Sequence, residues 1–414
     1  MNPPAHFVRS VAANVAHWLQ RAARFDTLDR DRDNIFRAVQ FGLSLPETWA
    51  AASELAIQLF EFVEVNGYWW DWITTLEKAI ENCPQEDLGM RCRLLNRLGF
   101  LYRLDERNLK ALETHKMALA IAERAGDAQE TFYTHFFLSG DYYTSHQYAE
   151  AERHGLSALE GFTGSGEVGG EYIATLNILG MVAHAKGDYL AAEERFTRAI
   201  TLWRGQPFST TCPGRSTWTS RPKLAQTLNN LAITLQAQNK FEDALARLTE
   251  ALTLLNDTSS KLAQTNTQIS LGSLYFAMKR LREAETTFRQ IEIAFLQEAG
   301  HTYYLAVTAN NLGNVLLERG RFWDAETYLR DSVALWREIN YPLMLANTLG
   351  DLGKTLVKQG NGNAAIPPYD EGIAILTTES GRPNYSDDAW VRKRLKELTA
   401  QREQAWNERI GKTG

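Results

Sequence analysis

The segment TLNNLAITLQAQNKFEDALARLTEALTLL, residues 227–255, contains a pattern that returns along most of the chain. Ala232 is a small residue that follows a leucine, and a second small residue, Ala244, comes twelve positions later. Leu248 and Ala251 follow four and seven positions after Ala244. Because steps of three and four mark one face of a helix, the segment predicts two helices that pack together, with small residues where their backbones approach.

The pattern recurs seven more times. Its first anchor is the small residue after a leucine, with a phenylalanine in the weakest copy, at Phe60, Gly99, Ser139, Gly180, Ala232, Gly272, Gly313 and Gly353. Successive anchors are 39 to 41 residues apart, except for one gap of 52 that contains the Pro-, Gly-, Ser- and Thr-rich residues 204–222. The second anchor lies at Trp72, Ala111, Ala151, Ala192, Ala244, Ala284, Ala325 and Ala365. Internal repeats of this length indicate a stacked array.

A helix stop separates the two helices in most copies. Seven residues after the first anchor the chain has Gly67, Gly187, Asn239, Gly320 and Gly360. Glycine, and then asparagine, most easily adopts the left-handed conformation that commonly ends a helix. The sequence therefore predicts an all-α chain of tandem helix–turn–helix units that stack into a right-handed superhelix.

Three regions follow from this register. Residues 1–46 form an N-terminal helical segment, residues 47–378 hold eight repeats, and residues 379–414 form a charged C-terminal capping helix. Pro367 and Pro368 fall within the second helix of the last repeat, where we expect a late start or a bend, because proline removes a backbone donor and clashes with the preceding turn. Candidate N-caps of the final helix are Asn384, Ser386, Asp387 and Asp388.

The repeated Leu-Gly, Tyr or Leu, Ala, Phe and Ala positions resemble the tetratricopeptide repeat. The usual period is about 34 residues, and the period here, near 40, implies longer helices, as in kinesin light chains and many bacterial regulators. The resemblance covers residues 51–376. It implies a binding protein whose first helices line a concave groove for a protein or peptide partner.

The N-terminal segment resembles a second, more specific pattern. HisTrpLeu at 17–19 and AspArgAspAsnIlePheArgAlaVal at 31–39 are similar to the segment after the nucleotide-binding module of bacterial STAND (NB-ARC) signal-transduction ATPases. Asn34, Arg37 and Ala38 match their Asn-Leu-Arg-Ala-Ala-Leu signature. The chain has no GxxxxGK[ST] loop, so it resembles only the C-terminal sensor region of such a protein, either cut out or encoded alone.

The composition of the chain argues against several kinds of partner and cofactor. The net charge of −6 and pI near 5.9 argue against a nucleic-acid partner, and no apolar run is long enough to cross a membrane. Three cysteines without a CxxC, Cys83, Cys92 and Cys212, suit a reducing cytoplasm. Histidines are scattered with no HExxH, so neither a metal nor another cofactor is expected.

Two short motifs resemble parts of nucleotide-binding sites, but the sequence around each one lacks the elements that such a site requires. Gly353-Lys354-Thr355 lacks the glycine five residues earlier and the preceding strand of a phosphate loop. The GxGxxG at 164–169 follows a predicted helix, whereas a dinucleotide site needs a strand before it. No catalytic arrangement stands out, so we expect a binding protein that is not an enzyme.

Candidate binding residues occupy three positions of each first helix, namely three before, two before and one after the first anchor, which face the groove in this repeat type. They are Asn96, Arg97, Phe136, Phe137, Asn177, Asn229, Asn230, Asn310, Asn311 and Lys354, together with the nearby Tyr133. A primary amide both donates and accepts, so it suits the backbone of an extended peptide. The alternative is that these asparagines bond to neighbouring helices and hold the repeat spacing.

Two functions fit this reading. The chain is either a ligand-, peptide- or protein-recognising sensor of a STAND-type regulator, or a stand-alone scaffold that assembles a protein complex. For both, we expect the ligand between the helix that carries Arg93, Arg97 and Arg103 and the helix that carries Asn310 and Asn311.

Overall fold

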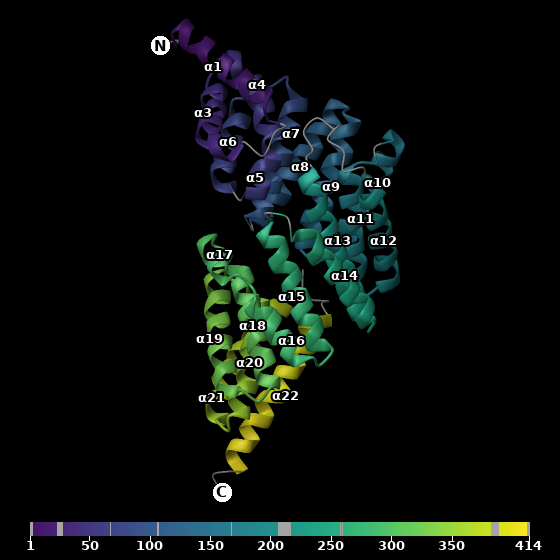
Figure 1. Cartoon of the computed structure of the whole chain (residues 1–414), viewed down its shortest axis with the longest axis vertical. Coiled ribbons are helices and arrows are strands. Elements are labelled where there is room, and N and C mark those ends of the chain that lie inside the picture. The colour runs from purple at the N-terminus through teal and green to yellow at the C-terminus, as the bar shows by residue number, and fades with distance from the viewer. Residues whose placement is uncertain are drawn as a thin grey trace. The chain divides into compact units, whose positions relative to one another are not determined.

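The computed structural model describes residues 3–22, 28–66, 68–105, 107–166, 168–205, 217–256, 258, 260–381 and 389–411, most of which lie in helices. No strand occurs within these ranges. The chain divides into two compact units, Met1–Leu231 and Ala232–Gly414, with the division inside helix α13. Figure 1 shows the helices of both units.

The first unit begins with two helices that precede the pairs and continues with paired helices. Its elements are α1 (Ala5–Leu19), η1 (Asp29–Asp31), α3 (Arg32–Leu43), α4 (Pro46–Gln58), α5 (Phe60–Asn66), α6 (Trp69–Glu81), α7 (Leu88–Leu104), α8 (Asn108–Ala125), α9 (Ala128–Thr144), α10 (Tyr148–Ser165), α11 (Gly170–Ala185), α12 (Tyr189–Gly205) and the start of α13 (Thr217–Ala237).

The second unit repeats the same arrangement. Its helices are α14 (Phe241–Leu255), α15 (Lys261–Ala277), α16 (Leu281–Arg289), α17 (Ile293–Glu298), α18 (Thr302–Glu318), α19 (Phe322–Glu338), α20 (Pro342–Lys358), α21 (Gly362–Ser380) and α22 (Ala389–Gly411). Within the two units, α7 packs on α8, α9 on α10, α11 on α12, α15 on α16, α18 on α19 and α20 on α21. The prediction of an all-α chain of tandem helix pairs is confirmed.

The anchors explain why the two helices of a pair lie close together. The second anchors from Ala111 to Ala365 are completely buried. A Cβ atom added to Gly180 would lie 2.6 Å from the ring of Phe196, sixteen residues later, and one added to Gly353 would lie 2.7 Å from the ring of Tyr369. Glycine at the first anchor therefore makes room for the large side chain of the second helix, as the register predicts.

The turns between paired helices have the predicted left-handed residues. Gly187, Asn239, Gly320 and Gly360 have positive φ angles, while Gly67 lies outside the described residues. His146 and Lys279 occupy the same repeat position and also have positive φ, of 58° and 60°. The packing of the repeat thus holds these two residues in a left-handed backbone conformation that residues with a side chain rarely adopt.

The start of the last paired helix differs from the prediction, and the predicted N-caps of the final helix are not described by the structure. Of the two expected effects of the prolines, a late start or a bend, the late start is wrong, because α21 begins at Gly362 and runs through Pro367 and Pro368. Asn361 starts the helix by accepting a hydrogen bond from the amide of Ala364, so the cap lies a full turn before the prolines. The candidate caps at 384 and 386–388 lie outside the described residues.

The predicted connection at 204–222 is shorter than expected. Helix α12 continues to Gly205 and α13 begins at Thr217, with Pro222 inside it. Residues 206–216, including Cys212, lie outside the described part. Among the described helices, none combines the length and apolar character needed to cross a bilayer.

Candidate functional site

The first helices of neighbouring pairs are joined by side-chain hydrogen bonds. Asn96 of α7 donates from Nδ2 to Oγ1 of Thr134 in α9, at 3.0 Å. In the second unit, Oγ1 of Thr348 in α20 donates to Oδ1 of Asn310 in α18, also at 3.0 Å. Both pairs are 38 residues apart and occupy equivalent repeat positions. We call the surface formed by the first helices of the successive pairs the first-helix face.

A threonine recurs five residues before the first anchor in six repeats, and two of these threonines, Thr134 and Thr348, bond to an asparagine. The six threonines are Thr134, Thr175, Thr227, Thr267, Thr308 and Thr348, each at most 3% exposed. Each hydroxyl oxygen also lies within hydrogen-bond distance of the backbone carbonyl four residues earlier. The periodic threonine was the sequence signal that could have shown which asparagines face a neighbouring helix.

The structure separates the predicted asparagines into two groups. Asn96, Asn177, Asn229 and Asn310, three residues before the anchor, are buried, at 2%, 9%, 2% and 5% exposure. Asn230 and Asn311, two before the anchor, are half-buried, and the amide of Asn230 donates to Oδ1 of Asn177 at 3.2 Å. Their burial, together with the bonds that Asn96, Asn177 and Asn310 make to neighbouring helices, supports the alternative that these asparagines hold the repeat spacing.

We expect the Asn310→Ala change to lower the free energy of unfolding by about 1–3 kcal/mol, since it leaves a buried threonine hydroxyl with one partner fewer. Thr348→Val and the double variant complete a cycle, in which the two changes should couple by about 0.5–3 kcal/mol. Urea unfolding measures each value. Asn311→Ala is the matched control, because no side-chain bond of Asn311 occurs in the described part of the chain. Equal losses for Asn310→Ala and Asn311→Ala would rule out the spacing role.

Arg97 stands out on the first-helix face of the first unit. Its guanidinium lies 5.0 Å from the ring centroid of Phe60 and 5.9 Å from that of Phe137. Among the described residues, no carboxylate comes within ion-pair distance of it, and its side chain is only partly buried. We call Arg97, Phe60, Phe100 and Phe137 the Arg97 cluster. Its guanidinium lies close to two aromatic rings and is only partly buried.

Two of the three other arginines of α7, Arg93 and Arg103, are paired with carboxylates of the chain. Arg93 forms an ion pair with Glu54 of α4 at 2.9 Å, and Arg103 forms one with Asp141 of α9 at 3.1 Å. Burial raises the pKa of Glu130, against the effect of Arg93 and Arg97 nearby. Arg97 therefore differs from Arg93 and Arg103 in lacking a direct carboxylate partner.

A buried polar group supports the Arg97 cluster from below. Asp141 and His115 are 1% and 0% exposed and bond to each other through Oδ2 and Nδ1, and Nε2 of His115 lies 3.1 Å from the carbonyl of Asn96. The imidazole stacks on Phe137 at 5.1 Å between centroids, with an angle of 4°. Arg103 also donates to the carbonyl of Phe137, at 3.2 Å. These contacts fix the ring on which Arg97 rests.

The predicted aromatic set divides between core and face. Phe136 and Phe137 are 8% and 3% exposed, so most of each ring is core, although Phe137 keeps its contact with Arg97. Tyr133 instead packs against Phe132 and against Phe162 of α10. Phe60 and Phe100, whose rings lie 5.5 Å apart, complete the cluster and were not on the predicted list.

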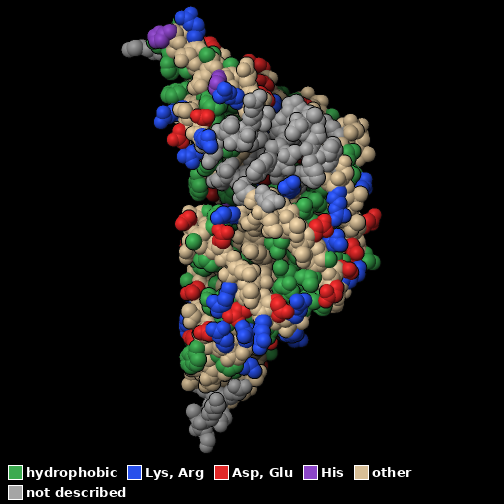
Figure 2. Space-filling view, viewed as in Figure 1, with side chains coloured by type: hydrophobic (Ala, Val, Ile, Leu, Met, Phe, Trp, Pro, Cys, Tyr) green, Lys and Arg blue, Asp and Glu red, His purple; other side chains and the backbone are tan. Residues whose placement is uncertain are grey.

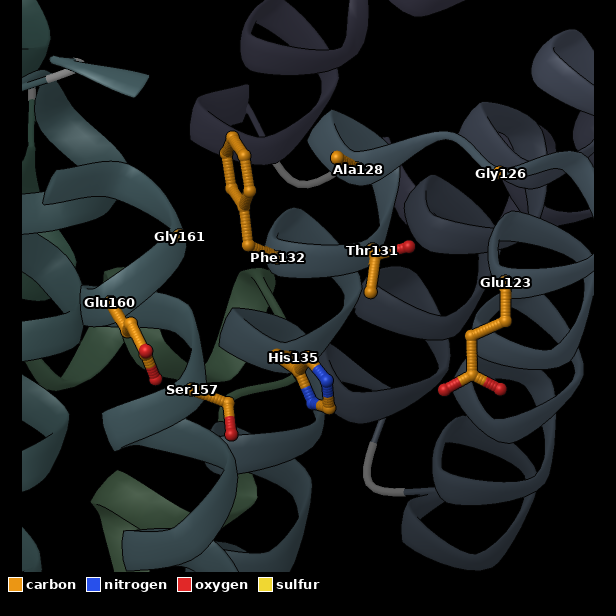
Figure 3. A pocket seen from close by; sticks show the side chains of 9 residues that line it. All are labelled: Glu123, Gly126, Ala128, Thr131, Phe132, His135, Ser157, Glu160 and Gly161. Atoms are coloured by element: carbon orange, nitrogen blue, oxygen red, sulfur yellow. The ribbon is translucent and has the colours of Figure 1, made fainter. Parts of the chain in front are cut away.

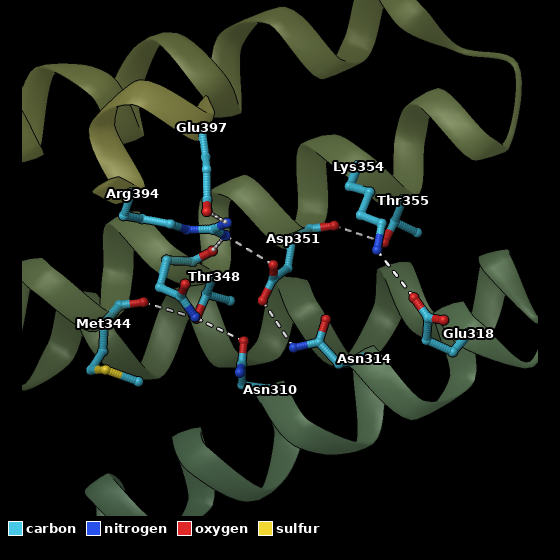
Figure 4. A network of polar contacts seen from close by, with 11 residues as sticks. Asn310, Asn314, Glu318, Met344, Thr348, Asp351, Lys354, Thr355, Arg394 and Glu397 are labelled. Atoms are coloured by element: carbon cyan, nitrogen blue, oxygen red, sulfur yellow. Dashed lines mark hydrogen bonds and ion pairs between the residues drawn. The ribbon is translucent and has the colours of Figure 1, made fainter. Parts of the chain in front are cut away.

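The first-helix face of the second unit is neutralised by its own side chains (Figure 4). Lys354 donates to Glu318 at 3.1 Å, which lowers the pKa of Glu318. Asp351 accepts from Asn314 at 2.9 Å and from Arg394 of the C-terminal helix α22 at 3.0 Å, while burial raises its pKa. Figure 2 shows acidic and basic side chains interspersed over this unit. Lys354 is thus committed to an internal partner.

Comparison with known proteins identifies the repeat. Two family models, both described as tetratricopeptide repeat, match the chain, one at residues 90–164, 261–338 and 304–378 and the other at 224–257. Together the matches span more than half of the chain. No curated protein matches it.

Several solved structures share the fold at low identity. A Rap protein in complex with competence and sporulation factor is 14% identical, with a TM-score of 0.57 over 84% of this chain and 98% of that one. The apo form of the quorum sensor NprR from B. thuringiensis is also 14% identical, with a TM-score of 0.57 over 89% and 99%. NprR in complex with its cognate peptide NprX is 15% identical, with a TM-score of 0.50 over 78% and 85%.

Proposed function

We propose, for a chain that belongs to the tetratricopeptide-repeat family, that it is a non-catalytic binding module and that the Arg97 cluster receives a carboxylate of a peptide or protein partner. A planar guanidinium forms two parallel hydrogen bonds with a carboxylate, which gives both affinity and orientation. The carboxylate would come from an acidic side chain or from the C-terminus of the partner.

The observation that carries the proposal is that Arg97 contacts two aromatic rings and, unlike Arg93 and Arg103, has no carboxylate partner among the described residues. Arg93 and Arg103 each reach a carboxylate of the chain itself, whereas Arg97 has none among the residues described. Its guanidinium rests on Phe60 and Phe137, an arrangement that keeps the charge oriented without neutralising it. Aromatic and arginine side chains together are typical of the residues that dominate binding energy.

The asparagines have a smaller part in this proposal than the sequence suggested. Asn230 and Asn311 are half-buried and remain candidates for contact with a peptide backbone. Asn96, Asn177 and Asn310 would reach a ligand only if their bonds to the neighbouring helices opened. We therefore propose that the Arg97 cluster provides most of the binding affinity. The buried asparagine amides would instead keep the helices at their spacing.

The similar structures support a peptide as the partner by analogy of fold. A Rap protein is seen with competence and sporulation factor, and NprR with the peptide NprX. Fold alone does not fix function, so the argument rests on the Arg97 cluster. The signature at Asn34, Arg37 and Ala38 further suggests that the module serves as the sensor of a STAND-type regulator, with the partner's binding controlling an ATPase.

The experiment is selection of peptides from a random display library by the intact chain, followed by affinity measurement with the Arg97→Gln chain. The proposal expects selected peptides that share an acidic residue or a free C-terminus and that bind the variant weakly. Peptides without a required carboxylate, bound equally by both chains, would rule the proposal out.

A further inference from the structure

A histidine and an aspartate occupy core positions of the repeat next to the Arg97 cluster, and both are at most 1% exposed. His115 of α8 lies four residues after the second anchor, where other copies have the buried Leu76, Phe196, Leu248, Phe288, Leu329 and Tyr369. Asp141 of α9 lies two residues after the first anchor, where other copies have the buried Leu101, Val182, Leu274 and Val315. Because a buried ion pair is often no more stable than apolar residues of similar size, packing alone does not explain this pair.

The packing around His115 holds its imidazole in one orientation. A Cβ atom added to Gly99 would lie 2.5 Å from Nε2 of His115, so the glycine of the first anchor makes the space in which the ring lies. The ring stacks on that of Phe137, with an angle of 4° between their planes. Each ring nitrogen is therefore directed at one particular neighbouring group.

Both ring nitrogens of His115 face oxygen atoms that accept hydrogen bonds. Nδ1 is bonded to Oδ2 of Asp141, and Nε2 lies 3.1 Å from the carbonyl oxygen of Asn96. A neutral imidazole has a single N–H and would turn a lone pair toward one of these oxygens, whereas an imidazolium donates to both. Arg103 donates to Oδ1 of Asp141 at 3.1 Å, which favours the ionised carboxylate. The hydrogen bonds therefore indicate a charged His115.

The buried group then has more positive than negative charge. Arg103 and His115 share the single carboxylate of Asp141, and within the described part of the chain no other carboxylate pairs with either cation. The ring centroid of Phe137 lies 5.1 Å from that of His115 and 5.9 Å from the guanidinium carbon of Arg97. One unneutralised positive charge therefore lies close to Arg97.

A second histidine pair, on α9 and α10, has the opposite arrangement. Arg153 lies 2.9 Å from Nε2 of His154, and because a guanidinium can only donate, this nitrogen accepts. Nδ1 of His154 lies 2.7 Å from Nδ1 of His135, which lines a pocket of about 540 Å³ among α8, α9 and α10 (Figure 3). Burial lowers the pKa of His154 to about 4, and Arg153 adds to this effect. His154 is therefore neutral near pH 7 and provides an internal reference for His115.

We propose that His115 is a positioning residue of the Arg97 cluster, which holds the ring of Phe137 in place as an imidazolium and adds its positive charge to the attraction of Arg97 for an anionic ligand. The inference rests on the proposed function, because the added charge favours binding only if the ligand is an anion. In a partly buried site, unit charges about 10 Å apart still change affinity by about fivefold or more.

The nitrogen NMR signals of isotope-labelled histidine test the protonation of His115 without any ligand. The signals are assigned with the His115→Gln and His154→Phe variants of the full chain. At pH 7 we expect protons on both ring nitrogens of His115 and on only one nitrogen of His154. A single protonated nitrogen at His115 would overturn the proposal.

Two variants test the contribution of the charge to binding. His115→Gln removes one positive charge and leaves Asp141 neutralised by Arg103, so affinity for a carboxylate should fall by about fivefold or more. Adding Asp141→Asn removes the negative charge as well and restores the net charge through Arg103. The double variant should therefore return to within about twofold of the parent affinity. A role in packing alone predicts no such recovery, since the second change disturbs the same buried hydrogen bonds further.

Three small molecules serve as probes, and isotope-labelled phenylalanine reports their binding through the ring signals of Phe100, assigned with the Phe100→Tyr variant. Nα-acetyl-glutamate amide has a side-chain carboxylate, Nα-acetyl-glutamine has a C-terminal carboxylate, and Nα-acetyl-glutamine amide has neither. We expect one or both carboxylates to shift the signals saturably and the neutral amide to leave them unchanged. The responding carboxylate also shows whether an acidic side chain or a C-terminus fits the Arg97 cluster.

The Arg97→Gln chain separates the two proposals. If it responds to the carboxylates as the parent does, the proposed function fails and the role of His115 fails with it. If Arg97→Gln loses binding while His115→Gln binds like the parent, the proposed function stands and the role of His115 is overturned. Weak binding by His115→Gln that the added Asp141→Asn change does not restore overturns that role as well. Melting curves show whether each variant is folded.

Discussion

Replacing Asp141 with alanine is expected to lower the free energy of unfolding around α7, α8 and α9 by about 3–5 kcal/mol. Asp141 is 1% exposed and is the anionic partner of both Arg103 and the fully buried His115. Its removal leaves the charge of Arg103, whose side chain is 14% exposed, without its carboxylate. The cost arises from the uncompensated buried charge, so it should exceed that of a surface ion pair.

Hydrogen exchange locates this loss. In a repeat array, stability is carried by each repeat and its neighbours, so amides of α7 to α9 should exchange faster while those of α18 to α21 keep the parent rates. Asp331→Ala, an exposed aspartate of α19, is the control and should change stability by less than about 0.5 kcal/mol. Unchanged exchange in α7 to α9 would mean that Asp141 does not hold these helices together.

The Arg97→Glu change is expected to weaken binding of a selected acidic peptide by about a hundredfold or more. The change removes a charge-assisted contact worth about 1.5–3 kcal/mol and sets a like charge against the ligand carboxylate. The Arg97→Gln change removes the charge without reversing it. It should lower the affinity by about tenfold or more, through loss of the charge-assisted contact alone. Fluorescence anisotropy with a labelled peptide measures both affinities.

Arg93→Gln is the matched control for Arg97. Both arginines lie on α7, but the guanidinium of Arg93 is already bonded to Glu54. The control should therefore change affinity by less than about threefold, through loss of surface charge alone. Melting curves should remain close to that of the parent for both Gln variants. Equal loss of affinity at 93 and 97 would mean that general positive charge, and not the Arg97 cluster, attracts the peptide.

Much of the fold could be predicted because the signals are local. Ala111, Ala192 and Ala325 are completely buried where the register places them, since the spacing of small and large residues follows directly from helix geometry. The positive φ of Asn239 follows from the residue type. The positive φ of Lys279 could not be predicted from its residue type, because the packing of the repeat overrides the usual preference of lysine for a negative φ.

The site was harder to predict because its bonds cross between helices. Nothing in the spacing of Arg93 and Arg97 shows that only the first meets a carboxylate, which comes from Glu54, 39 residues earlier. His115 occupies the position of a large apolar residue, and its partner Asp141 lies 26 residues away. The asparagines were recognised as a set, but only the buried threonines facing them reveal their helix-to-helix bonds.

Photo-cross-linking from α7 tests the location of the binding site most directly. Phe100 lies in the Arg97 cluster, with its ring 6.0 Å from that of Phe137, and can be replaced by the aromatic photo-reactive residue p-benzoylphenylalanine. Leu109, at 78% exposure on α8, receives the same residue as the control. We predict that a selected peptide cross-links to position 100 and not to position 109, and that excess unlabelled peptide prevents the cross-link. Cross-linking at 109 without cross-linking at 100 would contradict a binding site on the first-helix face.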